Sequence, residues 1–305
     1  MGLALTFVAA TLWAAVTKRA KPPHWSRSAT ETFFSDAREK LEGQRPAAGA
    51  GGARPAGGPA AMESDSGGAA AGSYAWSKLI GPDELEDEIK TMQKQYSETI
   101  TLPAPFKGGG YKTARRQLTE LALLFGIIAE YDGDVRWKKD APSMRELLAR
   151  TGFACKAGSD QSFNEAKLRK DDLESLVRGG NGPNVPNVEA KAEWEKVASR
   201  PPLMQRLEIA QQQGVAPGVA SADGFKKNQE KVLKEAELIS AIGEVIARNG
   251  YEFADVEAYL GFAKQMRDAA IAIADAVKSK NYDAARAASG KIDKACSQCH
   301  EGYRS

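Results

Sequence analysis

The sequence predicts an all-α protein with a four-helix bundle at its C-terminal end. Alanine is abundant and runs of β-branched residues are scarce, a composition that favours helices over strands. From residue 76 onward, apolar residues recur every three or four positions, which is the period of an amphipathic helix. Short segments of Gly, Pro and Asn separate these stretches and predict the breaks between helices.

Residues 1–17 predict a signal or membrane-anchor segment. Positions 3–16 are apolar but short for a membrane span, and they fit the apolar part of an export signal. Lys18, Arg19 and Lys21 follow this run instead of preceding it, and that order opposes export. We therefore expect the stretch to belong to a longer signal or anchor, with a buried apolar helix as the alternative.

Residues 18–75 predict a mostly disordered linker. The first part is polar, and positions 46–73 are almost wholly Gly, Ala and Pro with a little Ser. Such a segment buries too little apolar area to offset the entropy of ordering it.

Residues 76–200 predict a helical block. Asp83 is expected to cap a helix over 84–99, and an amphipathic pattern over 111–131 follows the break at 108–110. Weaker patterns predict helices over 142–154, 163–178 and 188–199. The acidic residues of helices 84–99 and 163–178 alternate with Lys and Arg, which indicates solvated faces.

Residues 201–305 predict the four helices of the bundle. Their apolar stripes run over 202–213, where Gly214 is the expected stop, and then over 224–248, 254–279 and 281–303. The connections are short, so neighbouring helices are expected to run antiparallel.

The last of these helices carries Cys296-Ser-Gln-Cys299-His300. C-x-x-C-H is the pattern that attaches a c-type haem, with two thioether bonds from the cysteines and an axial nitrogen from the histidine. On a helix, residues i, i+3 and i+4 share one face, so all three side chains can address one flat ligand. The sequence therefore predicts one covalent haem c at this site.

Two other sites that use C-x-x-C fit less well. A closed zinc site takes four N or S ligands, whereas the chain has three Cys and two His, so Cys155 and His24 would have to complete it from far away. A thioredoxin-like dithiol belongs near a βαβ pattern, and none is present. Cys155 is expected to be a buried thiol, with a regulatory thiol as the alternative.

A faint internal repeat relates the two helical regions. Positions 110–130 resemble 224–244, and 163–167 resemble 282–286. In the earlier copy Val177 stands where Cys296 should be, so the first region is expected to bind no haem. Shared helical periodicity is the alternative explanation.

The ending Ala295-Cys296-Ser297-Gln298-Cys299-His300-Glu301-Gly302-Tyr303-Arg304 resembles the cytochrome c′ family, the class II c-type cytochromes. The similarity extends over 254–305 and more weakly over 203–253. It implies a four-helix bundle with Cys296 and Cys299 as thioether sites, His300 as proximal iron ligand and Arg304 near the exposed haem face. It also implies that a homodimer is one assembly to test. The layout further resembles haem-motif proteins of planctomycete-type bacteria that share the stretch 130–137.

The second axial ligand divides the functional alternatives. His24 is the only other histidine and precedes the linker, so Met204 and Met266 are the remaining candidates within the chain. A methionine ligand would close the iron and suit it to outer-sphere electron transfer, whereas an open apolar site would admit NO or CO. Methionines at helical spacing also simply fill cores.

These observations predict an exported mono-haem cytochrome, periplasmic or otherwise extracytoplasmic, that passes single electrons to a redox partner protein. The alternatives are a five-coordinate protein that binds NO or CO and a structural protein that haem stabilises. No catalytic set is visible, so an enzyme is not expected. The net charge of +2 and the lack of a basic block predict no nucleic-acid partner.

Overall fold

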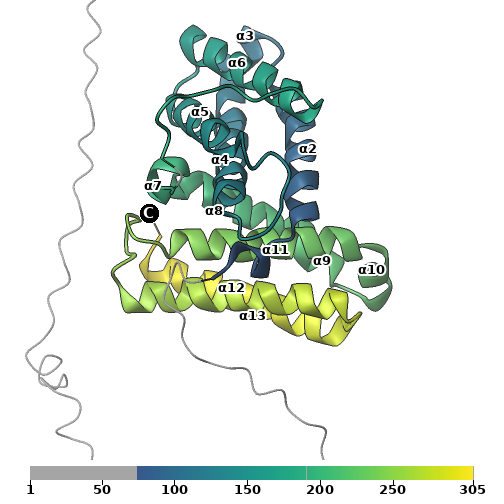
Figure 1. Ribbon diagram of the computed structural model, residues 1–305. Coiled ribbons are helices and arrows are strands. Elements are labelled where there is room, and N and C mark those ends of the chain that lie inside the picture. Colours follow the sequence, from purple (N-terminus) through teal and green to yellow (C-terminus); the bar gives the residue numbers. More distant parts are fainter. Residues whose placement is uncertain (1–73, 190, 305) are drawn as a thin grey trace, which may run out of the picture. The chain divides into compact units, whose positions relative to one another are not determined.

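The computed structural model describes residues 74–189 and 191–304, which belong to one compact unit, Asp65–Ser305. These residues form helices and turns with no β-strand among them, so the all-α prediction is confirmed (Figure 1). The predicted signal or anchor segment, nearly all of the predicted linker and His24 lie outside the described residues.

The first helical block comprises α2 (Pro82–Thr99), α4 (Tyr111–Glu130), α5 (Ala141–Ala154) and α6 (Asp160–Val177). The short α3 (Pro103–Pro105) and η3 (Phe106–Gly110) connect α2 to α4. Helix α2 begins after Gly81 with Pro82 in its first turn, so the expected cap at Asp83 is wrong. Asp83 instead adds negative charge near the positive end of the helix dipole.

The second helical block is a four-helix bundle. Its first member is α8 (Arg200–Ile209), continued by η4 (Ala210–Val215) and α9 (Ala216–Gly218). After α10 (Ala222–Lys227) come the long helices α11 (Gln229–Ile246), α12 (Glu257–Lys278) and α13 (Tyr282–Gly302), and α12 lies between α11 and α13 (Figure 1).

Three predicted helices differ in the structure. Gly214 does not stop the first bundle helix, because a π turn carries the chain past it. A Cβ at Gly214 would lie 2.5 Å from Glu235 Cγ, so the glycine lets η4 approach α11 closely. The helix expected over 224–248 is broken at Asn228, whose side chain donates to the Gly224 carbonyl at 2.7 Å. Of the helix expected over 188–199, only α7 (Trp194–Val197) forms.

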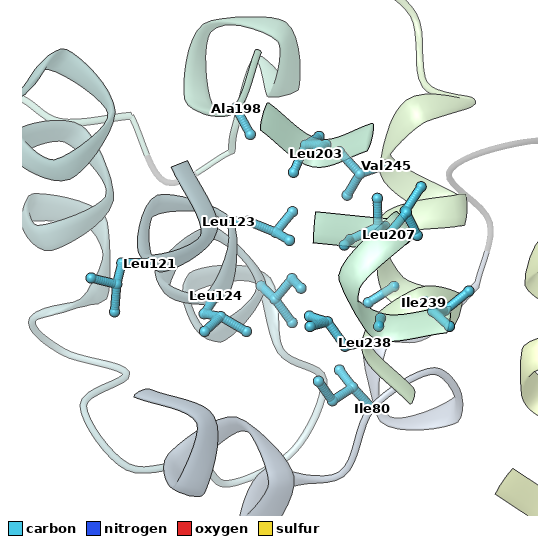
Figure 2. Packing of buried hydrophobic residues seen from close by; sticks show 14 of the residues in the cluster. Ile80, Leu121, Leu123, Leu124, Ala198, Leu203, Leu207, Leu238, Ile239 and Val245 are labelled. Carbon is cyan, nitrogen blue, oxygen red and sulfur yellow. The ribbon is translucent and has the colours of Figure 1, made fainter. Parts of the chain in front are cut away.

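The two blocks share one apolar core. Figure 2 shows Leu123 and Leu124 of α4 and Leu203 and Leu207 of α8 entering the same cluster, with Leu238 of α11 and Ile80 beside them. All six are buried. Full burial of a Leu or Ile side chain contributes about 1.5–3 kcal/mol to stability, so this cluster contributes a large part of the free energy that holds the two blocks together.

A buried charged cluster crosses the same junction. Arg206 of α8 donates from Nε to Glu120 Oε1 of α4 at 2.5 Å, from Nη1 to Glu235 Oε2 of α11 at 2.8 Å, and from Nη2 to Glu88 Oε1 of α2 at 3.2 Å. Lys234 Nζ lies 2.7 Å from Glu88 Oε2. Glu88 is therefore buried, which corrects the expectation that all acids of this helix face solvent.

The segment Tyr74–Gly81, which includes η2 (Trp76–Lys78), is bonded to both blocks. Tyr131 of the first block donates to the Ile80 carbonyl at 2.9 Å, and Ser240 of the second block donates to the Leu79 carbonyl at 2.6 Å. The Arg248 guanidinium lies over the Trp76 ring at 4.4 Å. The segment therefore fastens the chain at the junction between the blocks.

The two blocks repeat one plan. In each, a long helix leads through a loop into the next helix of the block, and the loop holds an aromatic residue with positive φ: Trp137 at 64° and Phe253 at 69°. In each, an aromatic residue in the first turn of the last helix packs on an aromatic residue that lies before the long helix of the same block. These pairs are Phe163 with Phe106, 5.4 Å between ring centroids, and Tyr282 with Phe225, 6.0 Å.

Candidate functional site

The Cys-x-x-Cys-His motif occupies the last turns of α13. Asn281 caps the start of this helix, since its side chain accepts a hydrogen bond from Ala284 N. The buried face of α13 consists largely of small residues, which allows it to lie close along α12; these are Ala285, Ala288, Ser289, Ile292 and Ala295. Cys296 and Cys299 are half-buried and His300 is exposed. A group attached to these residues therefore lies at the end of the bundle, open to solvent on one side.

Met266 of α12 is in contact with the motif. Its Sδ atom lies 3.9 Å from Cys296 Sγ, and its side chain is buried. Met204, the other predicted candidate for the second axial ligand, is half-buried on α8 and packs against the core. The structure thus brings Met266 together with Cys296, and Arg304 stands exposed beyond the end of α13.

Four aromatic rings gather beside the motif. Tyr303, three residues after His300, has its ring centroid 5.2 Å from that of Phe253, 5.7 Å from that of Tyr259 and 6.3 Å from that of Phe262. Tyr259 and Phe262 belong to the first turns of α12, and Phe253 to the loop before it. These rings, which we call the aromatic wall, give the end of α13 an apolar neighbour on one side.

A cation is buried next to the aromatic wall. Arg200, the first residue of α8, has its guanidinium 5.1 Å from the Phe253 ring centroid and donates to the Glu252 carbonyl at 3.0 Å. It also pairs with the Glu252 carboxylate. Its charge reaches Cys299, where it opposes the effect of burial on the thiol pKa. Sequence analysis did not identify Arg200, because its neighbours come from a segment about fifty residues further along the chain.

Burial keeps both motif cysteines in the thiol form. Burial, aided by the charges of Asp293 and Cys299, raises the pKa of Cys296 to about 11. Burial also raises the pKa of Cys299, against the nearby Arg200. Neither cysteine forms a disulfide, so both thiols are free. Cys155 is fully buried, as expected, and burial raises its pKa to about 12.

The π turn η4 reaches the motif helix from the other side. Gln211 donates from Nε2 to Ser289 Oγ at 3.0 Å and to Asp293 Oδ1 at 2.9 Å. Asp293 precedes Cys296 by three residues, so Gln211 fixes the turn of α13 that leads into the motif. The π turn places Gln211 here, and helical periodicity alone does not reveal such an insertion.

The donors present fit a haem better than a bare metal ion. Within 74–189 and 191–304, no three His, Cys, Asp or Glu side chains come together as a metal site. A haem brings its own four nitrogens and needs from the protein two thiols and an imidazole, which α13 supplies. The aromatic wall suits a flat apolar ring.

No family model, curated protein or solved structure matches this chain. Among the described helices, none combines the length and apolar character that crossing a bilayer requires.

Proposed function

We propose that this protein is a mono-haem c-type cytochrome that transfers single electrons to and from a redox partner protein. The observation that carries the proposal is the placement of Cys296, Cys299 and His300 in the last turns of one bundle helix, with free thiols and an aromatic wall beside them. A motif formed by chance would not be expected to meet all of these conditions.

Each residue then has a role toward the haem. Cys296 and Cys299 would hold it by thioether bonds, and His300 would coordinate its iron. Met266, whose Sδ lies 3.9 Å from Cys296 Sγ, and Met204 would be the two candidates for a further iron ligand. The haem contributes a one-electron couple, and His/Met ligation raises its reduction potential. The aromatic wall excludes water from one side, and burial of this kind also tunes a potential.

The exposed end of α13 is where a redox partner would approach, since His300 and Arg304 are both open to solvent.

We place the mature protein outside the cytoplasm, because the apolar N-terminal stretch fits an export signal and haem c attachment resembles extracytoplasmic chemistry.

The test is to express the full chain with a haem c maturation system and measure its mass and absorption. The expected result is a Soret band and a mass increase of one porphyrin. The variant Cys296→Ala/Cys299→Ala should lose both, whereas the matched control Cys155→Ala should keep both. A mature wild-type chain with neither signal would overturn the proposal.

Addition of CO to the reduced protein separates electron transfer from gas binding. A Met-ligated iron should show no shift, and Met266→Leu should then open the site and produce one. A large shift in the wild-type protein would instead assign the site to NO or CO binding. If the haem-free chain lost its fold, a structural role of haem would be supported.

A further inference from the structure

Two bulky aromatic residues, one in each block, adopt a backbone conformation that disfavours them. Trp137 has φ 64° and Phe253 has φ 69°. A left-handed backbone is strained at a bulky non-glycine residue and persists only where the surroundings enforce it. Each of the two occupies the loop that leads from the long helix of its block to the next helix. The contacts of the two rings show what enforces each one.

Trp137 is held by contacts within its own block. Its Nε1 donates to the Leu176 carbonyl at 3.2 Å, close to the end of α6, and its ring lies 6.3 Å from that of Phe125. The Arg136 guanidinium covers the ring at 4.7 Å, and Trp137 is buried. The strained residue therefore closes the end of the first block, where Val177 stands at the position that Cys296 has in the second.

Phe253 is held by residues of the candidate haem site. Its ring contacts Tyr303 at 5.2 Å and Tyr259 at 6.0 Å, and Arg200 lies over it at 5.1 Å. Phe253 has no polar side-chain atom, so ring packing and the cation hold it in place. Unlike Trp137, it is half-exposed. Tyr303 donates its backbone N–H to the Cys299 carbonyl at 2.9 Å, which links the Phe253 ring to the motif through one residue.

We propose that Phe253 is a positioning residue of the haem site: its left-handed backbone holds the ring against Tyr303, which fixes the last turn of α13 and keeps water from one edge of the haem. The proposal rests on the proposed function. Cys296, Cys299 and His300 remain sufficient to attach the haem, and Phe253 governs how firmly their turn is held and how far the haem is exposed.

The experiment compares Phe253→Gly, Phe253→Tyr and the matched control Trp137→Gly. Both glycine variants relieve the backbone strain and remove an aromatic ring. Only in Phe253→Gly is the lost ring one that lies beside the motif. Phe253→Gly should still carry one covalent haem, with a lower midpoint potential because water reaches the haem. Its reduced form should be oxidised by O2 about tenfold faster, which is the size of change found when residues that support the ligands of a metal are replaced. Phe253→Tyr should keep the wild-type midpoint potential and rate of oxidation, and Trp137→Gly should change neither.

A second measurement needs no haem. In the Cys296→Ala/Cys299→Ala background, Phe253→Gly should speed amide hydrogen exchange at residues 299–303, and Trp137→Gly should not. Equal exchange in the two glycine variants, or an unchanged potential in Phe253→Gly, would overturn the role of Phe253. Failure of the wild-type chain to take up haem would instead overturn the proposed function, so the two failures are distinguishable.

Discussion

The two helical blocks of this chain follow one plan but end differently. In the first, the last helix ends at Val177, and Trp137 closes that end with a hydrogen bond to Leu176. In the second, the last helix continues through Cys296, Cys299 and His300, and Phe253 stands half-exposed beside them. The difference shows that the same kind of loop can either cover the end of a bundle, as at Trp137, or lie half-exposed beside it, as at Phe253.

The blocks also differ in what each supplies to their junction. The first gives two carboxylates, Glu88 and Glu120, and the second gives Arg206, Lys234 and Glu235. With every group ionised, the cluster holds three negative and two positive charges. A buried net charge is costly, so one proton bound among the carboxylates would balance it.

The largest expected effect comes from removing the shared cation. Arg206→Met leaves three carboxylates facing one another without their common partner, and breaking a buried charge pair on one side costs about 3–5 kcal/mol. The measurement is the free energy of unfolding in urea. Arg178→Met is the control, because Arg178 is largely exposed and pairs only with Glu174 on its own helix. A loss equal to that of the control would mean that the junction does not depend on the cluster.

The next effect concerns pH. Burial and the charge of Glu88 raise the pKa of Glu120 to about 7, against the opposing Arg206. At Glu120 the folded protein therefore binds more protons than the unfolded chain between pH 4.5 and 7, and this carboxyl makes stability fall as the pH rises through that window. The charged groups of the same cluster are Glu88 on α2, Arg206 on α8 and Glu235 with Lys234 on α11.

Glu120→Gln should remove this dependence. Relative to wild type, its stability should rise between pH 5 and pH 7 by up to about 3 kcal/mol and stay level above pH 7. Urea unfolding at several pH values measures the difference. Glu130→Gln, also on α4, is the control, because Glu130 contacts Trp76 and pairs with Arg248 instead of Arg206. A difference between Glu120→Gln and wild type that does not vary with pH would contradict the expectation.

The sequence predicted the fold better than it predicted these interactions. The periods of α12 and α13 were sufficient because each of these helices buries one continuous stripe. The Arg206 cluster was missed because its carboxylate partners on the first block are 86 and 118 residues away, and within its own helix each residue resembles a solvated charge. The motif was evident from local spacing, whereas Arg200 and Phe253 act through tertiary contacts alone.

A smaller effect is the difference in alkylation rate between the thiols of the two blocks. In the chain expressed without haem, iodoacetamide should modify Cys299 first, then Cys296, and Cys155 only on unfolding. Alkylation requires the exposed thiolate, and Cys155 is fully buried with its pKa raised to about 12. Mass spectrometry of peptides over a time course gives the order. Early labelling of Cys155 would show that the first block opens more readily than the second.

The smallest effect tests how closely helices approach in each block. A Cβ at Gly243 would lie 3.1 Å from Arg267 Cβ and 3.3 Å from its Cα, which α12 can relieve only by moving its backbone. At Gly126 the nearest atoms, at 3.1 Å, belong to the Trp194 ring. We expect Gly243→Ala to cost about 1–2 kcal/mol and Gly126→Ala less, since a side chain shifts more easily than a helix. Thermal unfolding of both variants checks the order.

The attachment of Tyr74–Gly81 has a mechanical consequence. Any tension transmitted from the preceding residues enters the folded protein at the seam of the blocks, and not at the tip of a helix that could be peeled away turn by turn. There the load is divided among three hydrogen bonds, which must break nearly together. Tyr131 donates to the Ile80 carbonyl, Ser240 donates to the Leu79 carbonyl, and the Gly81 N–H donates to Glu237.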